Sequence, residues 1–152
     1  MRKQHPQQGV ALIELALAVP LMLLLSMIVI EFGRALYEYN TVTKSARDAV
    51  RYLSTKTLNT EDQTPAILCA DAKKLVVYGR IGTGSTPLAP GLKTGGVSCN
   101  WQTTGSLPLI DTVTVTVTGY RFKSMVSNVF GTRLTDGGIT FGPISATMRT
   151  QT

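Results

Sequence analysis

The pattern of apolar and polar residues predicts a long N-terminal helix followed by shorter elements. After a polar, basic leader of residues 1–9, residues 10–30 are apolar apart from Ser26, and Glu14 is their only charged residue. These 21 residues, at a rise of about 1.5 Å each, span roughly 30 Å, the thickness of the hydrocarbon core of a bilayer. We therefore expect a transmembrane segment at 10–30, in which Pro20 is tolerated with a kink.

The same helix is expected to continue to about Ser54. Glu31, Arg34 and Glu38 form opposite-charge pairs at helical spacing. Apolar residues recur at intervals of three and four at Phe32, Leu36, Tyr39, Val42, Ala46, Ala49, Val50 and Leu53. The second half is thus amphipathic, and its basic stripe of Lys44, Arg47 and Arg51 is interpreted as the solvated face.

The remaining elements indicate a small domain of residues 31–152. Thr64 and Pro65 favour the start of a second helix that ends near Gly79. Strands are predicted at 97–102, at 111–120, where valine alternates with threonine, and more loosely at 139–150, with a bulge or kink at 141–143. The expected fold is α+β and pilin-like, with the long transmembrane-to-amphipathic helix packed on a small antiparallel β-sheet.

The segment 121–130 has the spacing of one helical face. Its apolar residues fall at i, i+3, i+4, i+7 and i+8, and they are Phe122, Met125, Val126, Val129 and Phe130. Two interpretations stay open. The face packs on the core, or it is an exposed patch that contacts the membrane surface or a partner subunit.

The two cysteines, Cys69 and Cys99, both lie in the C-terminal part of the chain. The short basic N-terminus favours an N-in, C-out orientation, which places both residues outside the cytoplasm. A cysteine pair there is most simply a disulfide, and two buried thiols are the alternative. With a single histidine, in the leader, the chain offers no zinc-ligand pattern, and we expect neither a metal nor a cofactor.

Charge and motifs exclude several functional classes. The net charge of +6 falls to +4 if residues 1–9 are removed, because Arg2 and Lys3 leave with them. This excess is spread along the chain without a nucleic-acid-binding motif. No nucleophile–base–acid set is present, and the glycine-rich segments do not match a phosphate-binding loop. We therefore expect neither an enzyme nor a nucleic-acid-binding protein.

The boundary between leader and apolar segment carries the strongest functional signal. A carboxylate inside a lipid-length segment costs several kcal/mol unless it finds a partner, although Glu14 is near enough to the boundary to snorkel to the headgroups. Cutting after Gly9 makes Glu14 the fifth residue of the mature chain, a pattern that resembles the processing site of type IV prepilins and pseudopilins. A secretory signal peptide is disfavoured, because no small-x-small cleavage site follows the apolar core.

Residues 9–20, 30–37 and 46–52 resemble the TadE-like family of the tight-adherence, or Flp, pilus system, and 113–122 and 144–149 resemble it more loosely. The resemblance implies a pseudopilin or minor pilin that takes part in pilus assembly and thereby in cell adhesion. It implies cleavage of the Gly9–Val10 bond by a prepilin peptidase. It also implies an inner-membrane anchor with a periplasmic domain. The expected partners are other pilin subunits, the inner-membrane assembly platform and the lipid bilayer.

One position departs from the family pattern. The glutamate of the family motif is usually followed by an aromatic residue, whereas Glu14 is followed by Leu15. This leaves open which peptidase acts. An alternative function also stays open, that of an uncleaved, signal-anchored periplasmic scaffold or binding domain of a secretion or pilus machine.

Overall fold

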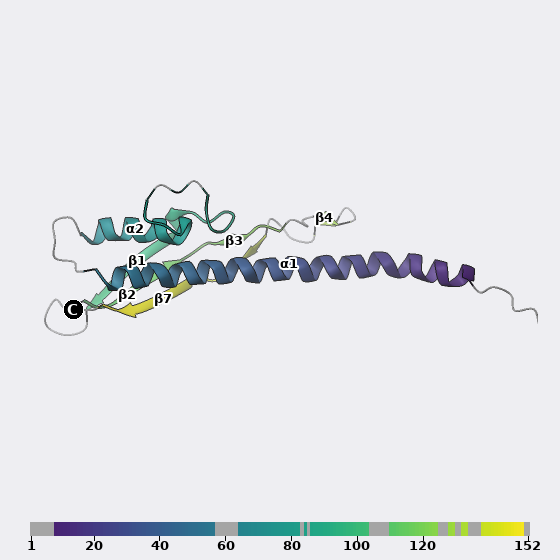
Figure 1. Ribbon diagram of the computed structural model, residues 1–152, viewed down its shortest axis with the longest axis horizontal. Helices are drawn as coiled ribbons and strands as arrows, with labels where there is room; N and C mark the ends of the chain where they lie inside the picture. Colours follow the sequence, from purple (N-terminus) through teal and green to yellow (C-terminus); the bar gives the residue numbers. More distant parts are fainter. Residues whose placement is uncertain are drawn as a thin grey trace, which may run out of the picture.

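The structure is a computed structural model that describes residues 8–56, 64–82, 84, 86–103, 110–124, 128–129, 132–133 and 138–150. It confirms the predicted α+β arrangement of one long helix and a small antiparallel sheet (Figure 1). In chain order the elements are α1 (Gln8–Ser54), α2 (Pro65–Tyr78), the 3-10 turn η1 (Thr94–Gly96), β1 (Val97–Thr103), β2 (Ile110–Val117), β3 (Arg121–Phe122), β4 (Asn128–Val129), β5 (Thr132–Arg133), β6 (Ile139–Thr140) and β7 (Ile144–Arg149).

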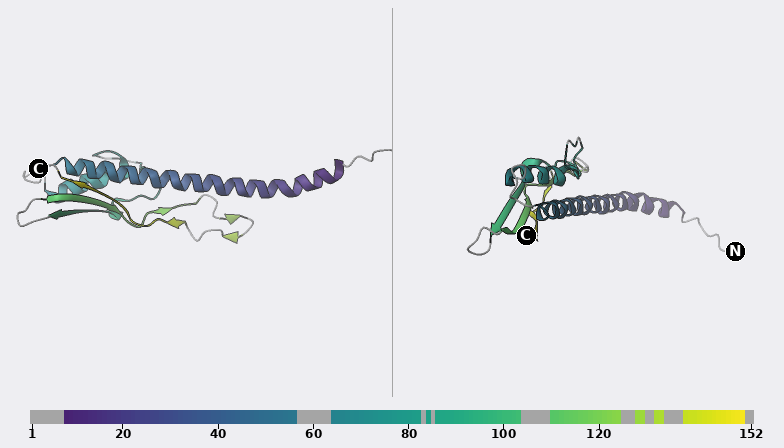
Figure 2. Two further views of the ribbon diagram at one scale, coloured as in Figure 1. Left: turned by 90° about the horizontal axis from the view of Figure 1, so that it is seen from below. Right: turned by 60° about the vertical axis from the view of Figure 1, so that its left-hand side comes forward.

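Helix α1 is continuous through Pro20 and has two different halves. The first turns of α1 project beyond the other elements, whereas its C-terminal half lies against α2 and the sheet (Figure 1 and Figure 2). The buried side of the C-terminal half has helical periodicity and consists of Ala35, Glu38, Val42, Ser45, Ala46, Ala49, Val50, Leu53 and Ser54. Its many small residues allow the strands to approach the helix closely.

The predicted apolar stripe is wrong at its first three positions. Phe32, Leu36 and Tyr39 are 63%, 46% and 37% exposed, although their spacing placed them on the buried face. The first residues of α1 that the domain buries are Ala35 and Glu38. In this part of the helix the buried face is therefore adjacent to the one that the apolar spacing predicted.

Helix α2 begins and ends where its local sequence predicts. The Thr64 hydroxyl accepts a hydrogen bond of 3.5 Å from the backbone N–H of Ile67, and Pro65 occupies the first turn. Gly79 ends the helix in a left-handed conformation (φ +71°), and its N–H donates to the carbonyl of Leu75 at 2.9 Å. Leu68, Ala72 and Val76 are buried in the core.

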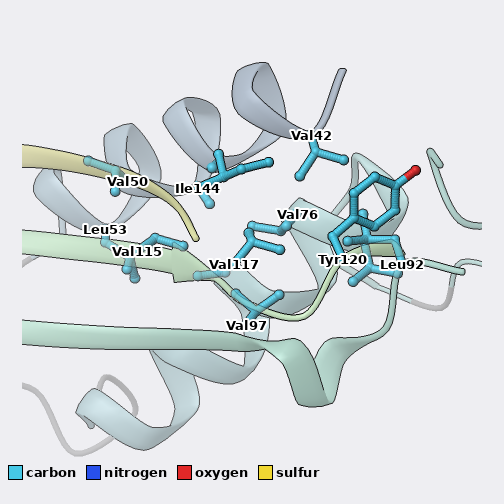
Figure 3. Close-up of a cluster of buried hydrophobic side chains, with 14 of the residues drawn as sticks. Val42, Val50, Leu53, Val76, Leu92, Val97, Val115, Val117, Tyr120 and Ile144 are labelled. Carbon is cyan, nitrogen blue, oxygen red and sulfur yellow. The ribbon is translucent and has the colours of Figure 1, made fainter. Parts of the chain in front are cut away.

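The main sheet has the order β1-β2-β7, and both pairings are antiparallel. Alternate residues of β2 point to opposite faces, as the valine–threonine pattern requires. Val113, Val115 and Val117 are buried against the helices, where side chains from α1, α2 and β7 converge on them (Figure 3). On the other face, the hydroxyls of Thr114 and Thr147 lie 2.8 Å apart.

The chain after β2 differs from the sequence-based prediction. The predicted strand 139–150 is two strands separated at 141–143, where a kink was expected; β7 pairs with β2, and β6 pairs with β3. The predicted helix over 121–130 is also wrong, because Arg121–Phe122 and Asn128–Val129 are strands. Phe122 is 1% exposed, so it packs inside the molecule. Met125, Val126 and Phe130 lie outside the described residues, as does the side chain of Val129.

Candidate membrane and assembly site

Gly9, Val10 and Glu14 all lie in the first turns of α1. Gly9 is exposed, and a Cβ added to it would meet nothing within 4 Å. Val10 and Glu14 are four residues apart on a helix, so their side chains lie one above the other on the same face. Glu14 is exposed, and the first turns of α1, in which it lies, are at the end of the helix away from the main sheet (Figure 1).

The apolar half of α1 has no protein covering within the described part of the chain. This helix is long and apolar enough to cross a membrane, and none of its most apolar 18-residue window is buried. Exposing so continuous an apolar surface to water is unfavourable, at about 25 cal/mol per Å². The segment therefore suits a lipid environment, other apolar helices, or both, and it is compatible with a membrane anchor.

Where the apolar segment ends, α1 is tied to the domain by a buried polar pair. The hydroxyl of Tyr120, just after β2, donates a 2.7 Å hydrogen bond to Oε2 of Glu38. Glu38 is 7% exposed and Tyr120 is 3% exposed. A buried carboxylate is stable only when it is paired and hydrogen-bonded, so this contact fixes how the helix sits against the end of β2.

Arg34 completes this network, which we call the Arg34–Glu38 network and which comprises Arg34, Glu38, Tyr120 and Phe122. Its Nε lies 3.6 Å from Oε1 of Glu38, and its guanidinium carbon lies 4.8 Å from the centre of the Phe122 ring. The guanidinium also donates to the backbone carbonyl of Lys123. Arg34 Nε is buried and makes no hydrogen bond, so the charge of Glu38 is what compensates it.

Phe141 packs against two members of this region. Its ring lies 5.8 Å from that of Tyr120 in a stacked arrangement and 5.3 Å from that of Tyr39 in a tilted one. Its backbone N–H donates to the carbonyl of Tyr120 at 3.0 Å. Phe141 thus holds the segment before β7 against α1.

The surroundings of Tyr120 change its acidity. Burial is the largest cause, followed by the hydrogen bond to Glu38 and the negative charge of that carboxylate, and together they raise the pKa of the Tyr120 hydroxyl well above 10.0. Tyr120 therefore remains a neutral donor at physiological pH.

Sequence reasoning found half of this network. The spacing of Glu31, Arg34 and Glu38 predicted ion pairs, and two are present, at 3.9 Å for Arg34–Glu31 and 3.6 Å for Arg34–Glu38. The partner on the domain, Tyr120, was missed because it lies 82 positions from Glu38. A glutamate on the buried side of an amphipathic helix was the available signal, since such a residue requires a donor.

The sulfur atoms of Cys69 and Cys99 lie at disulfide distance, 2.14 Å apart, with a Cα–Cα separation of 5.9 Å. They connect α2 to β1, and so join the second helix to an edge strand of the sheet. Within the described ranges, no group of three or more His, Cys, Asp or Glu side chains is placed to hold a metal ion.

The fold and this site define an α+β protein with one exposed, membrane-length N-terminal helix. Residues 9–51 match the family of TadE-like proteins. The match covers nearly all of α1 and confirms over this helix the resemblance inferred from the sequence. Neither a curated protein nor a solved structure matches the chain.

Proposed function

We propose that this chain is a pseudopilin or minor pilin of a tight-adherence pilus, with no catalytic activity of its own. The observation that carries the proposal is the apolar half of α1, which is exposed along its length and contains a single carboxylate. The TadE-like match over 9–51 supports the same conclusion. In this proposal α1 is anchored in the bacterial inner membrane, and residues 31–152 form the periplasmic domain.

Processing is proposed at the Gly9–Val10 bond, by a prepilin peptidase of the inner membrane. Arg2 and Lys3 keep the leader on the cytoplasmic side, because basic residues favour that side of a membrane. Gly9 has no side chain to obstruct a peptidase, and nothing of the domain lies near it. Cleavage gives Val10 a free, cationic amine at the start of the apolar helix.

Glu14 is proposed to pair with that amine in the assembled state. The amine of Val10 from one subunit and the carboxylate of Glu14 from a neighbour both face a low-dielectric environment when apolar helices bundle. Pairing relieves the cost of two buried charges together, whereas removal of one partner leaves the other uncompensated, at about 3–5 kcal/mol. The pairing therefore fixes how far neighbouring helices are shifted relative to one another along their axes.

The Arg34–Glu38 network gives the domain a fixed orientation relative to the membrane helix. It lies four to eight residues beyond Ile30, the last residue of the apolar segment. Helix α1 is continuous across this junction. In such a subunit the sheet lies at a fixed angle to α1. Packing of α1 against the helices of other subunits therefore also fixes the orientation of the sheet.

The decisive experiment is to determine the N-terminal residue of the chain recovered from membranes of piliated cells. Mass spectrometry is expected to find Val10 as the first residue. A chain that retains residues 1–9 in a strain whose other prepilins are processed would overturn the proposal in favour of an uncleaved, signal-anchored scaffold.

A further inference from the structure

The charged residues that follow the apolar segment of α1 are turned away from the surroundings. They are Glu31, Arg34 and Glu38, and none of them is exposed. Arg34 lies 3.9 Å from Glu31 and 3.6 Å from Glu38, so the three are paired with one another. The next charged residue along α1 is Lys44, which is exposed. Exposed charge on this helix therefore begins at Lys44, later than the sequence alone indicates.

The exposed side chains next to the apolar segment are themselves apolar or aromatic. Phe32, Leu36 and Tyr37 are 63%, 46% and 72% exposed. At about 100° per residue, they spread over roughly 140° of the helix circumference. An arc this wide is broader than the narrow seam along which two helices pack, and it suits lipid, which surrounds a helix on every uncovered side. Tyrosine in addition is typical of membrane–water interfaces.

The depth of these three side chains follows from the geometry of a helix. Tyr37 lies seven residues beyond Ile30, which is about 10 Å along the axis. Helical side chains point toward the N-terminus, so the Tyr37 ring covers the turn before it and reaches back toward the apolar segment. The headgroup layer extends roughly 5–8 Å beyond the hydrocarbon core on each side. The three side chains therefore end at the level of the headgroups.

The domain adds an exposed apolar residue at the same level. The ring of Phe122 lies 4.8 Å from the guanidinium carbon of Arg34, which is four residues, or about 6 Å, beyond Ile30. Phe122 of β3 pairs with Ile139 of β6, which is 48% exposed. Gly138 has a φ of +118°, and a Cβ there would collide with the carbonyl oxygen of Phe122, so glycine lets β6 approach. Figure 1 shows β3 on the side of the main sheet toward the apolar half of α1.

The exposed charges at this level are basic. Arg121 and Lys123 flank the buried Phe122, and both are exposed. The acidic residues at this level within the described ranges are Glu31 and Glu38, which are paired with the Arg34 guanidinium. Phosphate groups of lipids complement two exposed cations, whereas a second copy of this chain would bring the same cations to the contact.

We propose that a collar of six residues lies in the headgroup layer of the membrane that α1 crosses; they are Phe32, Leu36, Tyr37, Arg121, Lys123 and Ile139. Because the collar includes both α1 and the β3–β6 pair, the domain contacts the bilayer beside its anchor. This second contact fixes the rotation of α1 about its own axis as well as its depth. The inference rests on the proposed membrane anchoring of α1 and is independent of processing at Gly9.

The test uses the full-length chain reconstituted in vesicles of phosphatidylcholine and phosphatidylglycerol. The native cysteines are bonded to each other, so a single added cysteine can carry an environment-sensitive fluorophore. Tyr37→Cys and Ile139→Cys place this label on the two parts of the collar. Lipid nitroxides positioned near the headgroups or near the bilayer centre act as shallow and deep quenchers.

Three further labelled variants serve as controls. Asp48→Cys is matched to Tyr37→Cys, because Asp48 is exposed on the same side of α1, about three turns farther from the membrane. Ser98→Cys, exposed on β1, is the control for the domain. Leu21→Cys, inside the apolar segment, reports whether α1 is inserted.

The labels at positions 37 and 139 are expected to lose fluorescence with the shallow quencher and to lose little with the deep one. The label at 21 should respond to the deep quencher, and those at 48 and 98 to neither. If the label at 21 is quenched while those at 37 and 139 behave like the labels at 48 and 98, the proposal is wrong. Absence of deep quenching at 21 would refute the membrane anchor, and the collar with it. A blue shift at 37 or 139 that depends on the protein-to-lipid ratio, without quenching, would overturn the proposal in favour of a second copy.

The two cations are tested separately. In vesicles of phosphatidylcholine alone, shallow quenching at position 139 should be weaker than in vesicles that also contain phosphatidylglycerol. In the anionic vesicles, the added changes Arg121→Gln and Lys123→Gln should weaken it as well. Quenching at 139 that neither change affects would overturn the assignment of these cations to the headgroups.

Discussion

The hydroxyl of Tyr120 lies 2.7 Å from Oε2 of Glu38, and this one hydrogen bond joins the end of β2 to α1 across 82 positions of sequence. Glu38 lies eight residues beyond Ile30. The pair therefore connects the sheet to the helix close to the place where the proposed membrane segment ends. Its consequences for stability are directly measurable.

Replacing Tyr120 with phenylalanine keeps the ring that stacks on Phe141 and removes the donor to Glu38. The buried carboxylate is then left without this partner, and the free energy of unfolding should fall by about 1–3 kcal/mol. Denaturant unfolding of the full-length chain in detergent, followed by the fluorescence of Trp101, measures the change. Tyr37→Phe is the control, because Tyr37 is 72% exposed on the same helix. Equal stability of the two variants would refute a structural role for the bond.

The raised pKa of Tyr120 predicts how stability changes in alkali. Burial and Glu38 raise the pKa of its hydroxyl above 10.0, so the folded chain keeps a proton that the unfolded chain loses. The contribution of Tyr120 to the unfolding free energy should therefore be constant below about pH 9 and should decrease as the pH rises above about 10. Tyr120→Phe should have a shallower decrease. Some slope should remain, because burial and Asp71 also raise the pKa of Tyr52. Identical slopes for both proteins would contradict the assignment.

Removal of the cysteine pair should weaken the domain. Cys69 and Cys99 are 30 positions apart, and a loop of this length corresponds to about 3–4 kcal/mol in the chain-entropy model. The double variant Cys69→Ser, Cys99→Ser should lose about that much unfolding free energy. In the unaltered protein, denatured without reductant, neither cysteine should react with a maleimide. Two reactive thiols in protein isolated from cells without reductant would show that the bond does not form in the cell.

Gly9→Val should block removal of the leader, because the peptidase would meet a branched side chain at the cleavage site. Gly33→Val is a matched control, since an added Cβ meets nothing within 4 Å at either glycine. Both changes place the same residue in α1, so any effect on helix propensity is shared. The mass of the recovered chain distinguishes the retained leader from the mature form. Normal maturation of Gly9→Val would show that this site is not the one recognised.

Glu14→Ala should be processed and folded but fail to assemble, because the Val10 amine of a neighbour would be buried without its counter-charge. Glu14→Asp should retain part of the activity, since it keeps the charge and shortens the reach. Asp48→Ala removes an exposed carboxylate from the other half of α1 and should assemble normally. Pilus recovery, measured together with subunit level and processing, reports the result. Wild-type piliation with Glu14→Ala would mean that the glutamate reaches the headgroups and has no role in assembly.

Local sequence predicted the elements whose buried positions recur every few residues along the chain. The length of α1, the start of α2 at Thr64 and Pro65, and the valine–threonine alternation of β2 were all evident from periodicity and capping residues. These features depend on neighbours within a few positions, which is why a single sequence contains them. The Gly9, Val10 and Glu14 pattern likewise lies within one short stretch of chain.

The region 121–130 shows where this reasoning fails. Its spacing fits an apolar helical face, yet Arg121–Phe122 is a strand because Thr140 and Ile139 supply backbone partners for it. Gly138 allows that close approach, and Arg34 covers the Phe122 ring from α1. Contacts made by residues distant in sequence outweighed the local pattern.

The sequence by itself determined that the chain has a membrane-length helix, an amphipathic continuation and a β-rich end. Only the tertiary structure decided that Glu38 meets Tyr120, that the chain after residue 138 divides between two sheets, and that Arg34 covers the Phe122 ring. The physical reason is that periodicity records which side of an element is buried, whereas the identity of the covering residue depends on the path of the whole chain.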